Sequence, residues 1–408
     1  MRNLCDRLYC CDKGLRCKFQ GITGQVLDTK MERFFWGSLL FISYTYIGYP
    51  FWLFLRKLFL ANPLPVYEAG KELPGVSVII AAYNEEKNIC QRIENISRQN
   101  YPQSKIQIIV VSDGSTDRTV SELSKLNCPN LEIIMLLENQ GKAVAINSGV
   151  AAAKGEITIF SDVRQNFDPF AIAYLVDAFS DHNIGCVSGE LILLKNGESS
   201  IHTEIGLYWK YEKWIRKMES ATGSVVGATG AIYAIRKKLY RSLPQGTLLD
   251  DVLTPMNIVT QGYRCVFNSN AIAYDYVSKD LTQEWKRKVR TLTGNWQLLN
   301  LSPSLLVPWK NPIWGRFLAH KIYRLLVPFA LVVLFLTSPL SQGIFYKIAT
   351  LLQIILYLLA LFGKFFPVAR KNKLVNLIYF FMVMNAAAVT GLWKLISGRC
   401  NDVWQSNL

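Results

Sequence analysis

Charged residues are scarce in this chain of 408 residues: they make up 18% of it, against roughly 25% in a typical soluble domain. Hydrophobic residues reach 50%, and the long apolar runs lie near the two ends. This distribution argues against an ordinary soluble protein and is typical of an integral membrane protein. The length allows one or two domains with a sizeable core.

Several common motifs are also absent. The nine cysteines include no CxxC pair, which excludes a zinc finger. No nucleic-acid-binding motif accompanies the net charge of +15, so we expect no nucleic-acid partner. The first apolar run begins near Phe34 without a small-residue cleavage site after it, so we expect no signal peptide. Internal repeats and low-complexity segments are missing.

The cysteines fall into two groups. Those near the N-terminus fit either disulfides, if this segment lies outside the cell, or acylation beside the membrane. Those of the central region are expected to be small hydrophobic residues in a reducing compartment. The first group is Cys5, Cys10, Cys11 and Cys17, and the second is Cys90, Cys128, Cys186 and Cys265; the ninth, Cys400, lies apart near the C-terminus.

Four apolar segments predict transmembrane helices. The first is long enough to span a bilayer and is closed by Arg56 and Lys57. The other three follow a large central region. The predicted parts are a basic, cysteine-rich segment (1–33), a transmembrane helix (34–61), a domain with interfacial helices at its C-terminal end (62–320), three transmembrane helices (321–397) and a tail (398–408).

The charges of the loops predict the orientation. The 339–344 loop has no charge, whereas the 364–373 loop has four basic residues and is therefore predicted to be cytoplasmic. This arrangement puts the central domain in the cytoplasm and both termini outside. Seven Lys and Arg residues in segment 1–33 favour the opposite side.

The central region alternates short, β-branched apolar runs with stretches of helical character. The runs are 76–82, 106–112, 131–137 and 157–161. This alternation predicts an α/β domain with a mostly parallel, doubly wound sheet. Asp113 and Asp162 follow two of these strands, at the edge where such sheets bind ligands.

Six motifs occur in a fixed order: AAYNEE (81–86), VSDGSTD (111–117), ENQGKAVAIN (138–147), FSDVRQ (160–165), LLDDV (248–252) and RKVRTLTGNWQ (287–297). Taken alone, each also fits a structural role, such as a turn, a helix cap or a basic membrane interface. Their order resembles that of the membrane-embedded family 2 glycosyltransferases, which include cellulose, hyaluronan and poly-N-acetylglucosamine synthases. The resemblance covers about residues 70–400.

The resemblance implies a GT-A fold and an inverting transferase. A sugar would move from a nucleotide-sugar, expected to be a UDP-sugar, to a glycan or lipid-linked acceptor at the cytoplasmic face of the plasma or inner membrane. Tyr83 and Glu85 would lie near the base or ribose, and Asp113 would contact the base. Lys142 would lie close to the nucleotide; it is not a Walker lysine, because the glycine-rich run of that motif is absent.

Asp162 matches the first aspartate of the family's Asp-X-Asp motif, which implies a Mg²⁺ or Mn²⁺ ion bridging the donor's phosphates. Arg164 stands where the second aspartate belongs. Either Arg164 supplies positive charge itself, or an acid elsewhere completes the metal site.

LLDDV stands at the family's Thr-Glu-Asp motif. Asp251 matches the general base that accepts the proton of the attacking hydroxyl. Asp250, and Gly230 in the preceding GATGAIY loop, are implied on the acceptor side. The structural alternative is an acidic pair that stabilises a helix N-terminus.

RKVRTLTGNWQ corresponds to the Gln-X-X-Arg-Trp signature. Arg290 matches the arginine, while Arg287 replaces the glutamine and Thr291 the tryptophan. Two guanidinium groups suit a diphosphate leaving group. Trp296 is a candidate to replace the missing tryptophan in stacking on the acceptor. Two rival interpretations are a catalytically silent, nucleotide-binding scaffold of a polysaccharide export system and a transporter with a cytosolic domain.

Overall fold

The computed structural model describes residues 30–62, 72–194, 202–276 and 281–399. The four N-terminal cysteines lie outside this part of the chain. The chain divides into two compact units. One holds Met1–Tyr49 and Leu326–Ala386, and the other holds Pro50–Leu325 and Ala387–Leu408. The larger unit therefore includes the end of the last apolar helix in addition to the predicted 62–320 domain.

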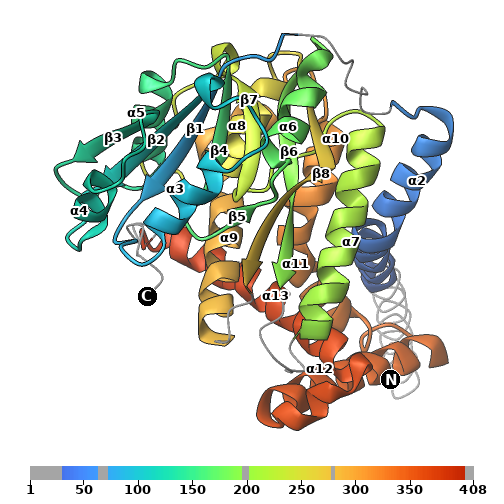
Figure 1. Ribbon diagram of the computed structural model, residues 1–408. Helices are drawn as coiled ribbons and strands as arrows, with labels where there is room; N and C mark the ends of the chain where they lie inside the picture. The colour runs from blue at the N-terminus through green and yellow to red at the C-terminus, as the bar shows by residue number, and fades with distance from the viewer. Residues whose placement is uncertain (1–29, 63–71, 195–201, 277–280, 400–408) are drawn as a thin grey trace, which may run out of the picture. The chain divides into compact units, whose positions relative to one another are not determined.

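An eight-stranded sheet forms the centre of the larger unit, in the order β3-β2-β1-β4-β7-β6-β8-β5 (Figure 1). Strands β3, β2, β1 and β4 are parallel, and β7 joins them antiparallel to β4. The strands are β1 (Val76–Ala82), β2 (Ile106–Asp113), β3 (Leu131–Leu136), β4 (Ile157–Ser161), β5 (Asn166–Phe167), β6 (Ile184–Leu194), β7 (Ile232–Arg236) and β8 (Arg264–Tyr276). The predicted α/β sheet is confirmed.

Both faces of the sheet are buried, which explains why its central strands are continuous apolar runs. Every residue of β1 is buried. Val78 and Ile80 pack into one core, and Ile79 packs into the other. The first core is covered by α3 (Ile89–Ser97), α4 (Thr119–Ser124) and α6 (Ala171–Asp177), and the second by α5 (Lys142–Ala152) and α8 (Asp250–Val259).

The turn after β1 is tied to the turn after β2. Asn84 has a φ of 53°, and its side-chain oxygen accepts hydrogen bonds from the backbone N–H groups of Thr116 (2.8 Å) and Asp117 (3.4 Å). Gly114 has a φ of +66°, and a Cβ there would lie 2.5 Å from the backbone nitrogen of Asn139. Only glycine therefore fits this turn. The two turns are held at one edge of the sheet.

Four apolar helices are long enough to cross a membrane. They cover Lys30–Phe59, Trp314–Thr337, Ile344–Phe365 and Lys373–Ile396. The first includes α2 (Tyr49–Phe59); the others include α10 (Trp314–Phe317) with α11 (Tyr323–Thr337), α12 (Ile344–Phe365) and α13 (Lys373–Ile396). A π-helical turn, Leu318–Ile322, lies between α10 and α11. The prediction of four spans agrees with these helices, although the second begins seven residues earlier than expected.

The smaller unit has its own packing. Phe35, Leu334 and Tyr346 form a small buried cluster, and the Trp36 indole N–H donates to the Tyr346 hydroxyl over 3.2 Å. Most of the large side chains of α12 are exposed, as expected for a helix whose surface faces lipid.

Candidate active site

Lys142 lies at the centre of the candidate site. It is the first residue of α5, after Gly141 with a φ of 95°. Its ammonium nitrogen lies 2.9 Å from Asp162 Oδ1 and 3.4 Å from Asp250 Oδ1. Burial opposes the charge of this lysine, but the carboxylates of Asp162 and Asp250 outweigh it and raise the pKa of Lys142. Three sequence motifs thus meet at one ion-paired cluster.

Asp250 faces into the cluster. Its side chain is 7% exposed; Oδ1 contacts Lys142, and Oδ2 accepts a hydrogen bond of 3.4 Å from the Tyr233 hydroxyl. Both oxygens are therefore engaged by the protein. In the structure Asp250 holds Lys142, and its contact with the acceptor stays a prediction.

Asp251 follows in the first turn of α8 and lies beside the loop that contains Gly230. A Cβ on Gly230 would be only 3.2 Å from Asp251 Oδ2, and the Asp251 carbonyl accepts the Ala228 N–H over 2.7 Å. Burial and the neighbouring Asp250 raise the pKa of Asp251 to about 6, against the opposing charges of Lys142 and other cations. A carboxylate with this pKa is ionised near neutral pH and accepts a proton more readily than an exposed aspartate.

Asp113 is fully buried at the end of β2. Its two oxygens each accept a backbone N–H over 2.8 Å, one from Gln140 and one from Gly141. Burial raises the pKa of Asp113, although both hydrogen bonds favour its charged form. In the structure this residue fixes the loop that starts the Lys142 helix, and its predicted contact with a nucleotide base stays a prediction.

Tyr83 and Glu85 lie in the turn after β1, at the same sheet edge. Glu85 accepts a hydrogen bond of 2.9 Å from the Asn88 amide, and its own N–H donates to Thr119 over 2.8 Å. Burial raises the pKa of Glu85, while the charge of Arg164 lowers it. Arg164 itself is exposed. The turn is thus near the Asp162 motif, as a donor site across these strand ends requires.

The predicted diphosphate arginines lie on α9 (Leu281–Leu301). Arg287 pairs with Glu284 over 2.5 Å and is 47% exposed. Arg290 is also exposed. Within the described ranges no contact links either guanidinium to the Lys142 cluster, so their contact with the donor remains a prediction.

Trp296 packs inside the larger unit, and its predicted stacking on the acceptor stays a prediction. Its side chain is 8% exposed, and its indole N–H donates to the Ala388 carbonyl on α13 over 3.0 Å. The ring therefore has a structural contact with α13.

The end of the RKVRTLTGNWQ motif has a structural role that the sequence did not predict. A Cβ on Gly294 would lie 2.5 Å from Leu249 Cγ, so α9 packs directly against the residues before Asp250. Gln297 accepts the Leu248 N–H over 3.0 Å and donates to the Gly246 carbonyl over 2.9 Å. The GNWQ residues therefore hold the loop that leads to the acidic pair.

Arg92 is a second residue near Asp162 that the sequence analysis did not single out. It is 1% exposed on α3; its guanidinium donates to Ser161 Oγ over 2.5 Å and lies 4.0 Å from the Phe167 ring centroid. Burial lowers the pKa of Arg92 to about 9, although the charge of Asp162 raises it. An arginine on the apolar face of a helix, among Ile89, Ile93 and Ile96, was the available signal.

A divalent cation fits this site only in part. Magnesium at nucleotide sites is commonly held by one or two carboxylates together with substrate phosphates. Asp162 is 38% exposed, so it has room to be one such carboxylate. Among the described residues no group of three His, Cys, Asp or Glu side chains could hold a metal alone. Asp162 would therefore share the ion with the donor's phosphates.

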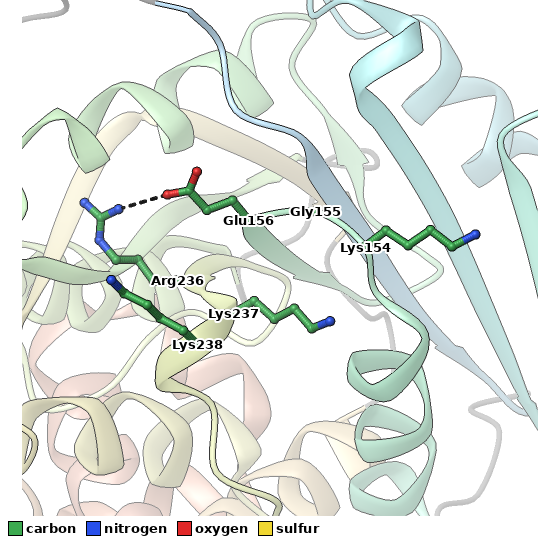
Figure 2. A pocket seen from close by; sticks show the side chains of 6 residues that line it. All are labelled: Lys154, Gly155, Glu156, Arg236, Lys237 and Lys238. Atoms are coloured by element: carbon green, nitrogen blue, oxygen red, sulfur yellow. Dashed lines mark ion pairs between the residues drawn. The ribbon is translucent and has the colours of Figure 1, made fainter.

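A separate basic pocket of about 360 Å³ lies at the opposite edge of the sheet, where β4 begins and β7 ends. Figure 2 shows Lys238 pointing away from Lys154 and Lys237, and Arg236 paired to Glu156; this ion pair measures 3.5 Å. Its lining residues are Lys154, Gly155, Glu156, Arg236, Lys237 and Lys238. None of the predicted site residues belongs to it.

The sheet, with acids and a lysine at the carboxyl ends of its strands, defines the class of fold as GT-A. The mannosyltransferase PcManGT from Pyrobaculum calidifontis, in complex with GDP-Man and Mn²⁺, matches with a TM-score of 0.66 at 20% identity. The match covers 90% of this chain and 99% of that one.

Sequence comparison gives the family. Residues 77–243 match Glycosyl transferase family 2, and residues 166–367 match Glycosyl transferase family group 2. The probable glycosyltransferase YdaM of Bacillus subtilis is 28% identical over 246 residues, 56% of this chain and 57% of the relative. A poly-beta-1,6-N-acetyl-D-glucosamine synthase of Staphylococcus aureus is 26% identical over 264 residues, 63% of each protein. Residues 77–367 of the chain therefore form a family 2 glycosyltransferase region, and the matches span less than two thirds of these curated relatives.

Proposed function

We propose that the protein is an inverting glycosyltransferase that moves a sugar from a nucleotide-sugar, expected to be a UDP-sugar, to a glycan or lipid-linked acceptor. The observation that carries this proposal is the convergence of Lys142, Asp162 and Asp250 at the strand ends, with Asp251 beside them. A base, a cation and a carboxylate open to a metal are the groups that such a transfer needs.

In the proposed reaction, an acceptor hydroxyl attacks the anomeric carbon of the donor sugar. The new C–O bond forms as the bond to the diphosphate breaks, so the diphosphate departs with the bonding electrons. Asp251 takes the hydroxyl proton, and its pKa of about 6 suits this task. A single displacement of this kind inverts the anomeric configuration.

Lys142 supplies positive charge near the leaving group. Asp162 and Asp250 keep its ammonium in place before the donor binds, so little reorganisation is needed during the reaction. Asp162 would also hold Mg²⁺ or Mn²⁺, which supplies charge neutralisation to a bound diphosphate. Arg287 and Arg290 are proposed to approach the diphosphate when the donor is present.

The catalytic domain is proposed to face the cytoplasm, where nucleotide-sugars are made. The basic 364–373 loop supports this side. Protease protection in sealed vesicles of known orientation tests it: cleavage within residues 62–320 from the cytoplasmic side only is the expected result.

The activity itself is tested with the full chain in lipid nanodiscs and a panel of radiolabelled nucleotide-sugars. Transfer that requires Asp251, with inversion seen by NMR of the product, is expected. Donor binding without any transfer, unaffected by Asp251→Asn, would instead support a catalytically silent scaffold.

A further inference from the structure

One face of α7 (His202–Ala221) is directed at the π-helical turn Leu318–Ile322. Glu212, Arg216 and Glu219 are spaced as i, i+4 and i+7, so they form one stripe along the helix. His320 lies between the two acids: Nε2 is 3.0 Å from Glu212 Oε2, and Nδ1 is 2.8 Å from Glu219 Oε1. The stripe that holds His320 therefore also contains Arg216.

The two acids of this stripe form their ion pairs with His320 and Arg324, not with Arg216. Arg324 forms a second ion pair with Glu212. Although burial disfavours the charged form, Arg324 and His320 hold the pKa of Glu212 well below its usual range. Arg316 donates to the Glu219 carbonyl over 2.7 Å. The acids thus fix the turn rather than neutralise Arg216.

Arg216 and Lys321 bring positive charge to the acceptor side of Asp251. Arg216 donates to Thr229 Oγ1 over 2.7 Å, and Thr229 precedes Gly230, which lies against the Asp251 carboxylate. Lys321 directly follows His320, which Glu212 and Glu219 hold in place. Both charges lower the pKa of Asp251.

Asp251 attracts both cations through its charge, and Glu212 attracts Lys321, but neither acid is a direct ion-pair partner. In the part of the chain that the structure describes, neither lies within ion-pair distance of a carboxylate. Both side chains are partly buried. Removing a charge from water is costly unless it is paired, so a pair of cations held beside the base is best explained by an anionic ligand.

We propose that Arg216 and Lys321 form a phosphate subsite for the acceptor. The acceptor is then a sugar carrying a phosphate or diphosphate, with its hydroxyl at Asp251 and its phosphate on the two cations. This inference rests on the proposed function and adds the chemical class of the acceptor. Guanidinium and ammonium groups both bind phosphate oxygens through charge-assisted hydrogen bonds.

The position of Lys321 favours a lipid carrier for this phosphate. It lies directly before α11, which is apolar over Tyr323–Thr337. A lipid diphosphate has its charged group at the membrane surface and its chain in the bilayer, where a helix such as α11 begins. A soluble sugar phosphate offers the same charge, and the test separates the two sources.

The test uses the full chain in nanodiscs and acceptors that differ only in phosphate. Hexose 1-phosphates are compared with methyl hexosides, and polyprenyl-diphosphate-linked hexoses with polyprenyl hexosides, the last two both in phosphatidylcholine vesicles. We expect transfer to the phosphorylated members. Arg216→Gln and Lys321→Gln should each raise the KM for the phosphorylated acceptors about ten-fold or more, because each variant loses one charge-assisted contact to the phosphate.

Two further variants separate a binding role from misfolding. Lys321→Arg retains the charge and should retain use of phosphorylated acceptors. Lys217→Gln removes an exposed charge one residue from Arg216 and should leave the KM unchanged. Turnover with the vesicle-borne acceptor alone identifies a lipid carrier, and turnover with both phosphorylated forms shows that the phosphate suffices.

The phosphate subsite would be overturned if neutral and phosphorylated acceptors were used equally well. It would also be overturned if the Gln variants raised the KM for the donor and not for the acceptor. Either result would leave the glycosyltransferase proposal standing. Absence of transfer from every donor to every acceptor would overturn the proposed function itself, and this inference with it.

Discussion

Replacing Asp251 by asparagine should stop catalysis and stabilise the fold at the same time. The pKa of this carboxyl rises from 3.8 to about 6 in the folded chain. Because the folded state binds the proton more tightly than the unfolded state, Asp251 contributes full stability below pH 3.8 and loses it as the pH rises through 6. At about 1.4 kcal/mol for each pKa unit, the loss amounts to about 3 kcal/mol at pH 8.

Asparagine is neutral at every pH and avoids this loss. The Asp251→Asn variant should therefore be more stable than the wild type by up to about 3 kcal/mol at pH 8, and by about half of that at pH 5. Its kcat should fall about 10²- to 10⁴-fold, the usual contribution of a general base. Thermal unfolding of the nanodisc-embedded protein at both pH values measures the first effect, and transfer of labelled sugar measures the second.

Asp177 provides a matched control. Burial raises the pKa of this acid too, but it lies on α6, across the sheet from α8. Asp177→Asn should gain stability with rising pH and keep its activity. The reasoning fails if Asp251→Asn is no more stable than the wild type at pH 8, or if it still turns over.

Two other outcomes test the site. Asp162→Ala should weaken donor binding in the presence of Mn²⁺ and have a smaller effect in its absence. Calorimetry of the wild type and the variant, each with and without Mn²⁺, measures this. Equal donor affinities in all four measurements would show that no cation binds at this site. Gly294→Ala places a Cβ 2.5 Å from Leu249 Cγ, so it should cost about 1–3 kcal/mol of stability and lower kcat by displacing the residues before the base. Gly315→Ala, which meets nothing within 4 Å, is its control in unfolding and transfer assays, and similar losses in both variants would contradict the packing argument.

The parallel half of the sheet was predictable because each of its strands is a short apolar run that can be recognised without knowing its neighbours. The run at 76–82 coincides with β1, and the run at 157–161 coincides with β4. Asp162 follows β4 directly, so its place at the carboxyl edge follows from strand periodicity and burial alone. The prediction of apolar helices depended on the same kind of local pattern.

Contacts between distant segments were not predictable in this way. Lys142 meets Asp250 across 108 residues, and the motifs that contain them do not specify that pairing. The sequence favoured Asp250 as an acceptor ligand because it neighbours the base. Its side chain points at a lysine, since the first turn of α8 directs consecutive residues in different directions.

Trp296 illustrates a different limit. An aromatic residue near a signature motif suits sugar stacking and helix packing equally well, and only its partner decides between them. That partner, Ala388, is 92 residues away. The resemblance to synthases with a stacking tryptophan suggested an acceptor role, whereas the structure shows a packing role for the same residue.

The contact between α9 and the end of α13 connects the last apolar helix to the loop before the acidic pair. Ala387 and Ala388 are almost completely buried, and a Cβ on Gly391 would lie 2.8 Å from the Thr293 backbone nitrogen. The next turn of α9 holds the loop before Asp250 through Gln297. A soluble fragment cut near residue 320 would lose the packing of α13 against α9 and expose apolar surface on α9. The enzyme is therefore best purified with its last helix, and lipids that shift that helix should change kcat without touching a substrate.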